Sequence, residues 1–377
     1  MKTNYLVKVF LILSLVSSSL NLSANTTAMQ DYLINMPKAE LHLHIEGSLS
    51  PERVAELSKA NKLDYFKTAE EVRHSLHNRE TGLNGFLAHY YKSLRVLVTQ
   101  QDFYDATYDL IKKLNENNIL YADLFFDPQE HTQRGISFQE FFEGIDRARD
   151  DAQKAFGIEI NLIMCFGRQF SANSAMQMLE QAEPYRSKII GLGMDSGPEY
   201  GNPPIKFKAV YKEARKRGYK LTGHHDVHVR DSLKHLEQSI NIIKMDRIDH
   251  GLDASQSPEI MVMLKAANLC LTGSPVKRKA NPEPQDLDWL RILDDNDVCV
   301  SLNTDDPTHF ETGYLNQMLI MVQDAAGFSK ERMTRFMLNA FRSLWIEESR
   351  KQAFIAKLKA YAEANGVNWQ LVIKSHH

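Results

Sequence analysis

The first candidate for chemistry is a histidine pair, His42 and His44, separated by one leucine. The pair ends an apolar run, 39–44, that is rich in strand-forming residues. Residues two apart on a strand face the same side, so both imidazoles point the same way. Neutral imidazoles that converge on one point suit a zinc ion. The alternative is an ordinary strand with two hydrogen-bonded histidines, and the pair alone does not separate the two.

A second histidine-rich segment repeats this spacing at the end of another apolar run. His224, Asp226 and His228 share one face of the expected strand, whereas His225 and Val227 share the other. The alternative is a surface turn with incidental affinity for metals. Placement at the end of an apolar strand favours an interior site, because the first of these residues should still lie inside the protein.

Two further strand ends carry polar residues. His250 precedes Gly251, which allows a tight exit turn, and Asp305 and Asp306 lie in the string SLNTDDP at 301–307. Adjacent aspartates before a proline are often a helix cap, and that alternative accounts for one of the two. Alternation places the two carboxylates on different faces, so one can bind a metal while the other meets a ligand.

Together these strand ends offer three histidines and one carboxylate, a mixed nitrogen and oxygen set for zinc with an open position for water. A site with two metals usually needs a bridging group on the fourth strand, and 189–195 contains no lysine, so we expect one metal ion. Zinc lowers the pKa of a water molecule to about 7. The expected reaction is therefore hydrolytic attack on carbon or phosphorus, and these ligands alone do not say which.

Such a site needs a scaffold that brings strand ends together, and the spacing of apolar runs predicts one. Eight runs rich in β-formers recur at 39–44, 119–127, 158–168, 189–195, 220–228, 248–251, 269–274 and 298–306. Amphipathic helical stretches lie between most of them, at 138–156, 204–217, 231–244 and 258–267. This order predicts an α/β fold, a single (β/α)₈ TIM-type barrel, with an open doubly wound sheet as the rival.

The carboxyl ends of barrel strands meet around one cavity, and polar residues gather at these ends. The predicted rim consists of His42, His44, Asp127, Arg168, Asp195, His224, Asp226, His228, His250, Ser274, Asp305 and Asp306. Residues 51–101 are longer than one crossover helix and predict extra helices that cap the barrel mouth. Residues after about 329 predict two terminal helices packed outside the barrel.

The composition is that of a globular protein, with 43% hydrophobic and 25% charged residues in 377. It excludes disordered, collagen-like and disulfide-scaffold proteins. Lys2 and Lys8 are the only charged residues before residue 25, so removal of 1–24 takes the net charge from −3 to −5. This mildly acidic balance gives no electrostatic reason to expect nucleic acid or an anionic membrane as a partner.

Residues 1–24 have the layout of a secretory signal peptide, with a short apolar run at 9–16 and small residues before the expected cleavage site. The run is shorter than the about 20 residues that cross a bilayer, and no cysteine follows it for a lipid anchor. We expect cleavage to leave residues 25–377 as one exported domain, periplasmic or secreted, without a membrane attachment. The alternative is a buried first helix.

The three cysteines, Cys165, Cys270 and Cys299, all lie in apolar runs. We interpret them as buried thiols rather than a disulfide framework, despite the expected export.

Four strings in this sequence resemble the adenosine/adenine deaminase family of the metal-dependent amidohydrolases. They are MPKAELHLHIEGS at 36–48, LTGHHDV at 221–227, DRIDHG at 246–251 and SLNTDDP at 301–307. Their order and spacing extend from about residue 30 to 350. The further strings FFDPQ at 125–129, HTQRG at 131–135 and YGNPP at 200–204 resemble the adenine-preferring branch.

The resemblance implies a function, hydrolytic deamination of a 6-aminopurine, adenosine or adenine, with release of ammonia in purine salvage. It implies one Zn²⁺ per chain, held by His42, His44, His224 and Asp305. It also implies that His250 orients or deprotonates the attacking water and that Asp306 contacts the purine. The cap at 51–101 would exclude water from the bound base, which strengthens electrostatic interactions inside the site.

One departure from the family pattern affects catalysis. The family usually reads HAGE on the fifth strand, where the glutamate protonates the ring nitrogen beside the attacked carbon, whereas this chain has Val227 at that position. Loss of a general acid costs roughly 10²–10⁴-fold. Asp226 is our candidate replacement, and His228 is the next. The string around Glu199 also departs from the usual spacing, so Glu199 either binds substrate or caps a loop.

Three functions therefore stay open at this stage. The first is deamination of adenosine or adenine. The second is deamination of an N⁶-substituted purine or another nitrogen heterocycle, which the altered Asp226–Val227 segment motivates. The third is a catalytically inactive purine-binding homologue. The sequence does not distinguish nucleoside from base, and it does not reveal the oligomeric state.

Overall fold

All eight predicted strands are present in the computed structural model, which describes residues 27–197, 200–225, 228–278 and 281–373. They are β1 (Lys38–His44), β2 (Ile119–Phe126), β3 (Glu159–Gly167), β4 (Ile189–Asp195), β5 (Lys220–Leu221) with β6 (His224–His225), β7 (Ile248–His250), β8 (Cys270–Gly273) and β11 (Cys299–Leu302). β5 and β6 are the two halves of the predicted fifth strand. β9 (Val276–Arg278) and β10 (Asn281–Pro282) form a separate antiparallel pair.

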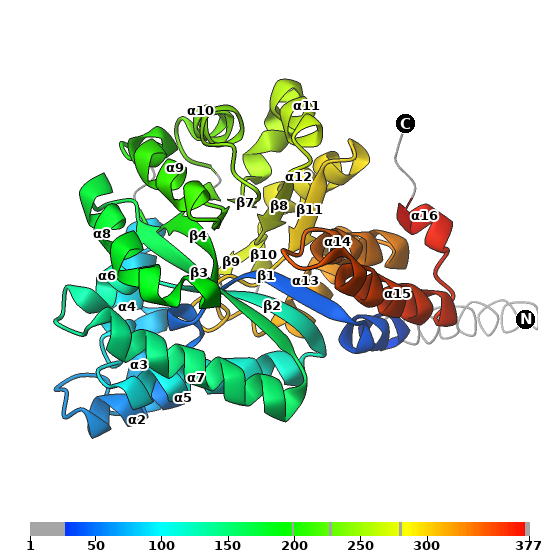
Figure 1. The fold of residues 1–377 in the computed structure, drawn as a ribbon. Helices are drawn as coiled ribbons and strands as arrows, with labels where there is room; N and C mark the ends of the chain where they lie inside the picture. Colours follow the sequence, from blue (N-terminus) through cyan, green and yellow to red (C-terminus); the bar gives the residue numbers. More distant parts are fainter. Residues whose placement is uncertain (1–26, 198–199, 226–227, 279–280, 374–377) are drawn as a thin grey trace, which may run out of the picture.

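Parallel pairing in chain order closes these strands into a barrel. One sheet runs from β1 to β5, and a second contains β6, β7, β8 and β11. The fifth strand links the two sheets, and Asp249 N donates to Gly223 O there at 3.0 Å. The last strand joins the first, because His44 N donates to Asp305 O at 3.0 Å and Asp305 N donates to His42 O at 3.1 Å. Figure 1 shows the strands at the centre with helices around them, as the predicted (β/α)₈ fold requires.

The crossover helices agree with the amphipathic stretches of the sequence. They are α5 (Gln100–Glu116), α7 (Phe138–Phe156), α8 (Ala172–Ala182), α9 (Lys208–Lys216), α10 (Ser232–Glu237) continued by η4 (Gln238–Ile243), α11 (Pro258–Ala266), α12 (Pro284–Asp295) and α14 (Lys330–Arg342). α7 has the predicted bounds because local signals fix both ends. The hydroxyl of Ser137 accepts from Glu140 N, and Gly157 adopts a left-handed conformation with φ of 70°.

The other elements between strands and helices are η1 (Glu46–Ser48), α6 (Pro128–Thr132), η2 (Glu183–Lys188), η3 (Pro204–Phe207), η5 (Leu252–Gln256) and α13 (Leu315–Ala326). α15 (Glu348–Ala364) and α16 (Trp369–Ile373) follow α14 at the end of the chain. The region after residue 329 thus forms three helices where two were predicted, and the first of them, α14, packs directly on β11 and β1.

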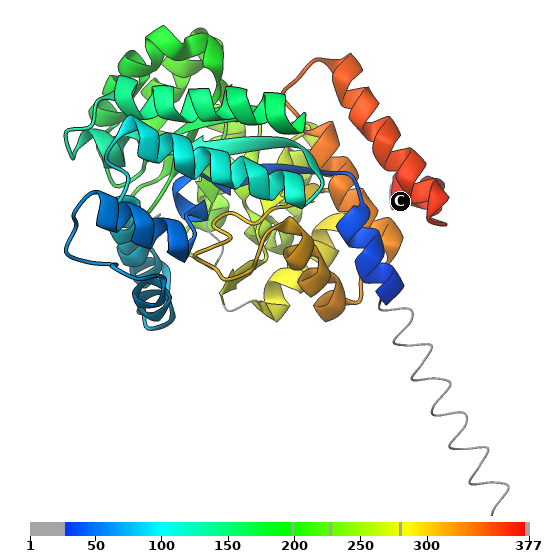
Figure 2. The ribbon, with the colours of Figure 1, turned by 90° about the horizontal axis from the view of Figure 1, so that it is seen from below.

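The segment at 51–101 forms the predicted extra helices, α2 (Pro51–Ala60), α3 (Ala69–His77) and α4 (Leu83–Leu94). We call these three helices the cap. In Figure 2 the blue cap helices and the orange-red α15 lie on opposite sides of the barrel. α4 packs against η1, which directly follows β1, so the cap is attached beside the strand that carries the first histidine pair.

The base of the barrel, at the amino ends of the strands, holds a buried ion pair. Arg247 is fully buried and donates through Nη1 to Asp123 Oδ2 at 2.7 Å. Tyr121 donates to the other oxygen of Asp123 at 2.6 Å. The guanidinium of Arg247 also lies 4.1 Å from the ring of Trp345. This charge is therefore neutralised and packed within the barrel itself.

A disulfide links Cys270 to Cys299, so the prediction of three buried thiols was wrong for these two residues. They are the first residues of β8 and β11 and pair directly in the parallel ladder, with Cα atoms 4.5 Å apart. The apolar sequence around each cysteine does not reveal this register. Cys165 is a buried free thiol, as predicted.

The predicted signal peptide, residues 1–24, lies outside the described residues. Across the described ranges, no helix has both the length and the hydropathy of a membrane span.

Candidate metal centre

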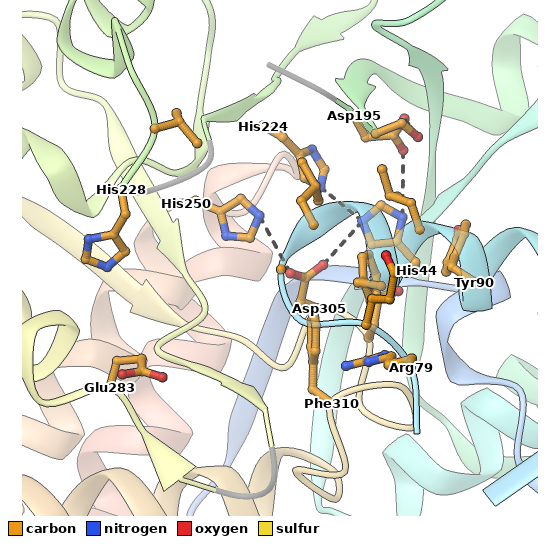
Figure 3. A pocket seen from close by; sticks show the side chains of 18 of the residues that line it. His44, Arg79, Tyr90, Asp195, His224, His228, His250, Glu283, Asp305 and Phe310 are labelled. Carbon is orange, nitrogen blue, oxygen red and sulfur yellow. Dashed lines mark hydrogen bonds and ion pairs between the residues drawn. The ribbon is translucent and has the colours of Figure 1, made fainter. Parts of the chain in front are cut away.

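Four buried side chains from the predicted set converge at the carboxyl ends of the strands. His42 Nε2 lies 3.1 Å from Asp305 Oδ1, and His44 Nε2 lies 3.5 Å from the same oxygen. His224 Nε2 lies 3.0 Å from His44 Nε2. None of the four residues is more than 5% exposed. The structure thus brings together every residue that the sequence predicted as a metal ligand. Figure 3 shows three of them, His44, His224 and Asp305.

The barrel places these donors through simple backbone rules. His42 and His44 alternate on β1, so both face the interior. His224 begins β6, where it pairs with Asp249 of β7. Asp305 lies just beyond β11 with φ of 64°, a left-handed conformation that is rare for residues other than glycine. The bridge between Asp305 and Leu43 holds this backbone in place.

The spacing of the four donors fits a metal ion. Two ligands about 2.0–2.1 Å from a tetrahedral zinc ion lie about 3.3–3.4 Å apart, and the separations here are 3.0–3.5 Å. His42 Nε2 is buried and has no hydrogen-bond partner among the described residues. The nearby histidines hold the pKa of Asp305 below its usual range, and burial lowers the pKa of His224. A neutral imidazole and an ionised carboxylate are the forms that bind a cation.

The outer nitrogens of the three histidines are also positioned. His42 Nδ1 lies 3.1 Å from Thr272 Oγ1, which in turn donates to Asp249 Oδ1 at 2.9 Å. His224 Nδ1 lies 3.0 Å from a backbone carbonyl, that of Met194. Such contacts fix the tautomer with a proton on Nδ1 and direct Nε2 to the metal.

His44 faces a carboxylate at a longer distance, without a hydrogen bond. Its Nδ1 lies 3.8 Å from Asp195 Oδ2. All three histidines therefore present Nε2 inward and Nδ1 outward.

His250 and Asp306 lie next to the four donors, as predicted. His250 Nε2 lies 3.6 Å from Asp305 Oδ2, and His250 has φ of 58° before Gly251 with φ of 73°. Gly251 is therefore the exit turn that the sequence predicted. Asp306 is 4% exposed, and its Oδ1 has no hydrogen-bond partner among the described residues. A Cβ on Gly47 would lie 1.5 Å from Asp306 Oδ1, so only glycine leaves room for this carboxylate.

A cavity of about 660 Å³ opens above these residues. This volume is typical of small-molecule sites. Leu83, Phe86, Leu87 and Tyr90 of α4 line it together with Phe310, whose ring stacks on Phe86 at 4.9 Å. The sequence predicted a cap but not these side chains, because no motif marks them. The only available signal was the excess length of 51–101.

A further buried acidic group lines the same cavity. Asp127 follows β2 and Asp195 ends β4, and they are 4% and 3% exposed. Tyr90 donates to Asp127 Oδ2 at 2.8 Å. Burial and the negative charges of Asp195 and Glu46 raise the pKa of Asp127 well above its ordinary value. The sequence placed Asp127 and Asp195 at the rim without giving either a role.

The predicted replacements for the catalytic acid have different outcomes. Asp226 lies outside the described residues, and so does Glu199, which was predicted to bind substrate or cap a loop. His228 lines the outer cavity, where its Nε2 lies 2.7 Å from Asp286 Oδ1 and its ring stacks on Trp289 at 4.6 Å. Figure 3 shows His228 apart from the cluster of His250, His224 and Asp305. Its position beside Asp286 does not support a role as the acid at the metal centre.

Comparison with known proteins agrees with this geometry. The adenosine deaminase family matches residues 37–361. An adenine deaminase of Psychrobacter cryohalolentis is 37% identical over 334 residues, covering 88% of this chain and 98% of its own.

Two solved structures share the fold. The adenine deaminase of Arthrobacter aurescens superposes with a TM-score of 0.79 at 29% identity, covering 87% of this chain and 99% of its own. An amidohydrolase of Burkholderia ambifaria, solved with bound Zn, has a TM-score of 0.78 at 21% identity, covering 90% and 95%. The extent of these matches and the convergent histidines and aspartate lead to one assignment: the chain belongs to the adenosine deaminase family of metal-dependent amidohydrolases.

Proposed function

We propose that this protein catalyses zinc-dependent hydrolytic deamination of a 6-aminopurine, releasing ammonia. The observation that carries the proposal is the convergence of His42, His44, His224 and Asp305 on one point beneath the cavity. Three nitrogens and one oxygen at tetrahedral spacing favour zinc over the all-oxygen sites of magnesium and calcium. One such group supports one Zn²⁺ per chain.

The residues around this point suit attack by water on an electron-poor ring carbon. Zinc, when bound, supplies a Lewis acid that lowers the pKa of a water molecule to about 7. His250 lies beside Asp305, where its imidazole can orient that water and hold its proton. Asp306 presents an unpartnered carboxylate oxygen to the ring nitrogens of the base. The apolar side chains of α4 exclude bulk water from the bound purine.

The last proton must reach the ring nitrogen beside the attacked carbon. We assign this role to Asp226, because the usual glutamate position holds Val227 and Asp226 is the nearest carboxylate in sequence to His224. Substitution Asp226→Asn should lower kcat by about 100-fold or more at unchanged zinc content. Retention of full kcat in this variant would remove Asp226 from the mechanism.

The names of the relatives favour adenine as the 6-aminopurine, because both the Psychrobacter and the Arthrobacter proteins are adenine deaminases. The altered segment at 226–227 supports a second candidate, a deaminase of N⁶-substituted purines, in which a bulkier leaving group meets an altered acid. Activity on N⁶-methyladenine well above that on adenine would favour this second candidate.

We also propose that the enzyme is exported and acts in the periplasm or outside the cell. The layout of residues 1–24 supports export, and the Cys270–Cys299 disulfide is the kind of link that persists in oxidising compartments. Expression of the full chain followed by fractionation tests this. Mature protein that begins near residue 25 in the periplasm or medium is the expected result, and uncleaved protein in the cytoplasm would contradict it.

The test of the activity uses purified protein of measured zinc content, incubated with adenine, adenosine and N⁶-methyladenine. Ultraviolet absorbance reports conversion to hypoxanthine or inosine, and an independent assay measures the amine released. We expect stoichiometric release of ammonia from adenine, adenosine or both. Zinc-loaded protein that binds these purines without turnover would instead support the inactive purine-binding homologue.

A further inference from the structure

The inner wall of the cavity carries more hydrogen-bond acceptors than the metal centre uses. We call Asp127, Asp195 and Tyr90 the acidic wall. Asp127 Oδ2 accepts from the Tyr90 hydroxyl at 2.8 Å, whereas Asp127 Oδ1 has no hydrogen-bond partner among the described residues. Asp127 and Tyr90 are both 4% exposed and line the cavity. A buried acceptor without a donor costs roughly 1–3 kcal/mol, so its presence in a ligand cavity points to a donor on the ligand.

The protein's own charges do not neutralise this acceptor. His131, four residues after Asp127, pairs with a different carboxylate, because its Nε2 lies 2.9 Å from Glu46 Oε1. The same Glu46 oxygen accepts from Asp127 N at 3.0 Å, which fixes the Asp127 backbone and adds a second negative charge beside it. Within the described residues, Asp127 forms no ion pair with a lysine, arginine or histidine. The acidic wall therefore offers a hydrogen-bond acceptor to a ligand in the cavity.

A second metal ion would satisfy this wall poorly. His44, Asp127 and Asp195 lie close enough to be considered as a cation site. His44 presents Nε2 to the first metal point, however, and a histidine that binds metal through one nitrogen normally keeps a proton on the other. That proton faces Asp195, since Nδ1 and Oδ2 are 3.8 Å apart. Asp195 Oδ2 therefore faces His44 as an ion-pair partner, and Asp127 Oδ1 is the acceptor that has neither a hydrogen bond nor an ion pair among the described residues.

We propose that Asp127, held by Tyr90, accepts a hydrogen bond from the ring N–H of the purine and so selects the free base over the N9-linked nucleoside. This inference rests on the proposed function. A free 6-aminopurine carries an N–H on its five-membered ring, remote from the attacked carbon, and a nucleoside has a glycosidic bond at N9 instead. The carboxylate form of Asp127 offers Oδ1 as this acceptor while Oδ2 is bonded to Tyr90, because a carboxylate accepts at both oxygens.

Tyr90 makes the selection depend on the cap. Its hydroxyl orients Asp127 Oδ2 from α4, so Oδ1 is the oxygen left for the base. A sugar on N9 removes the donor and adds bulk against the Tyr90–Asp127 contact. Sites built to bond a substrate N–H or O–H reject an analogue without it by about 10⁴–10⁵-fold in favourable cases. We expect at least about 10³-fold here, in favour of adenine over 9-methyladenine.

The experiment compares adenine, 9-methyladenine and adenosine on zinc-quantified wild type, Asp127→Asn and Tyr90→Phe. In Asp127→Asn the Tyr90 hydroxyl still finds the amide oxygen, so the amide nitrogen replaces the acceptor Oδ1 and faces the ligand. We expect kcat/KM for adenine to fall about 100-fold or more, and kcat/KM for 9-methyladenine to change about 5-fold or less. Tyr90→Phe should lower kcat/KM for adenine about 10-fold. Glu283→Gln, at the outer cavity, is the matched control and should keep the wild-type ratio of the two substrates.

Calorimetric binding of hypoxanthine and 9-methylhypoxanthine to the same proteins gives a readout without turnover. Wild type should bind hypoxanthine at least about 100-fold more tightly, and Asp127→Asn should lose most of that difference. The inference is overturned if wild type binds and deaminates the N–H and N-methyl compounds equally well. It is also overturned if a folded, zinc-loaded Asp127→Asn variant keeps the wild-type preference for the N–H compounds. Absence of turnover in every substrate overturns the proposed function alone, because the binding measurement still tests Asp127.

Discussion

The mouth and the base of the barrel both bury charged groups, but several carboxylates at the mouth have unpartnered oxygens whereas Asp123 at the base has a donor for each oxygen. At the mouth, Asp127, Asp195 and Asp306 each have one oxygen without a hydrogen-bond partner among the described residues. His250 and Asp305 there adopt left-handed backbone conformations. Such strain persists only where the surrounding structure imposes it.

At the base, Asp123 accepts from Tyr121 and Arg247, at 2.6 and 2.7 Å. Asp249, between the two regions, accepts from the hydroxyls of Thr222 and Thr272, at 2.7 and 2.9 Å. The difference indicates that the buried groups at the base stabilise the barrel. Those at the mouth are left to bind a metal ion and a substrate. Substitutions at the two ends should therefore have separable effects on activity and on stability.

The largest expected effect is at the mouth. Asp305→Ala removes the only carboxylate of the metal centre, so zinc content should fall below about 0.1 per chain and kcat should fall by at least about 10⁴-fold. The free energy of unfolding of the metal-free protein should change by about 1 kcal/mol or less, because the barrel base is untouched. Elemental analysis, the deamination assay and urea unfolding check these three quantities. A large loss of stability without metal would contradict the proposed separation.

At the base, Arg247→Met should destabilise the protein by about 3–5 kcal/mol, because it leaves Asp123 buried and unpaired. The double variant Arg247→Met with Asp123→Asn is the matched control and should recover part of this loss. kcat per zinc-loaded folded molecule should remain within about 3-fold of wild type. A kcat that falls in proportion to the lost stability would contradict the separation of stability at the base from activity at the mouth.

The disulfide at the base should contribute a somewhat smaller amount. Cys270 and Cys299 close a loop with a sequence separation of 29, for which chain entropy predicts about 3–4 kcal/mol. Urea unfolding with and without reductant measures this, and the Cys270→Ser, Cys299→Ser double variant is the control that reductant should not affect. Equal stability of oxidised and reduced protein would show that the link does not restrain the barrel.

The smallest expected effect concerns pH. Burial lowers the pKa of Lys38, at the start of β1, to about 7, and its ammonium contacts the carbonyls of Ile34 and Met36. Between pH 7 and about 10 the unfolded chain binds this proton and the folded protein does not, so Lys38 makes stability rise with pH by up to about 1.4 kcal/mol per unit. Unfolding of wild type and Lys38→Met at pH 7 and 9 measures this slope. An identical pH dependence in both proteins would contradict it.

The sequence revealed most of the mouth because its signals are local. Alternation on β1 places His42 and His44 together, and apolar runs that end in polar residues identified all eight strands. The barrel placed the candidate donors at one rim, and the resemblance to the adenosine/adenine deaminase family implied which four of them bind the metal. These features need no knowledge of contacts between distant segments.

The features that the sequence did not reveal depend on pairing between distant segments. Cys270 and Cys299 meet because β8 and β11 pair in one register, which neither segment specifies alone. Tyr90 reaches Asp127 from a helix of the cap, 37 residues earlier in the chain. Arg247 finds Asp123 across the barrel, although each occurs in an unremarkable apolar context. Asp226 and Glu199, in contrast, remain predictions from the sequence.

The central claim is that the four-ligand mouth binds one zinc ion and uses it for deamination. The most direct measurement titrates zinc into chelator-treated protein while following ammonia released from adenine and adenosine. We predict that turnover of at least one substrate rises linearly with bound zinc and saturates at one ion per chain. Protein that holds one zinc ion per chain and releases no ammonia from either purine would contradict the account.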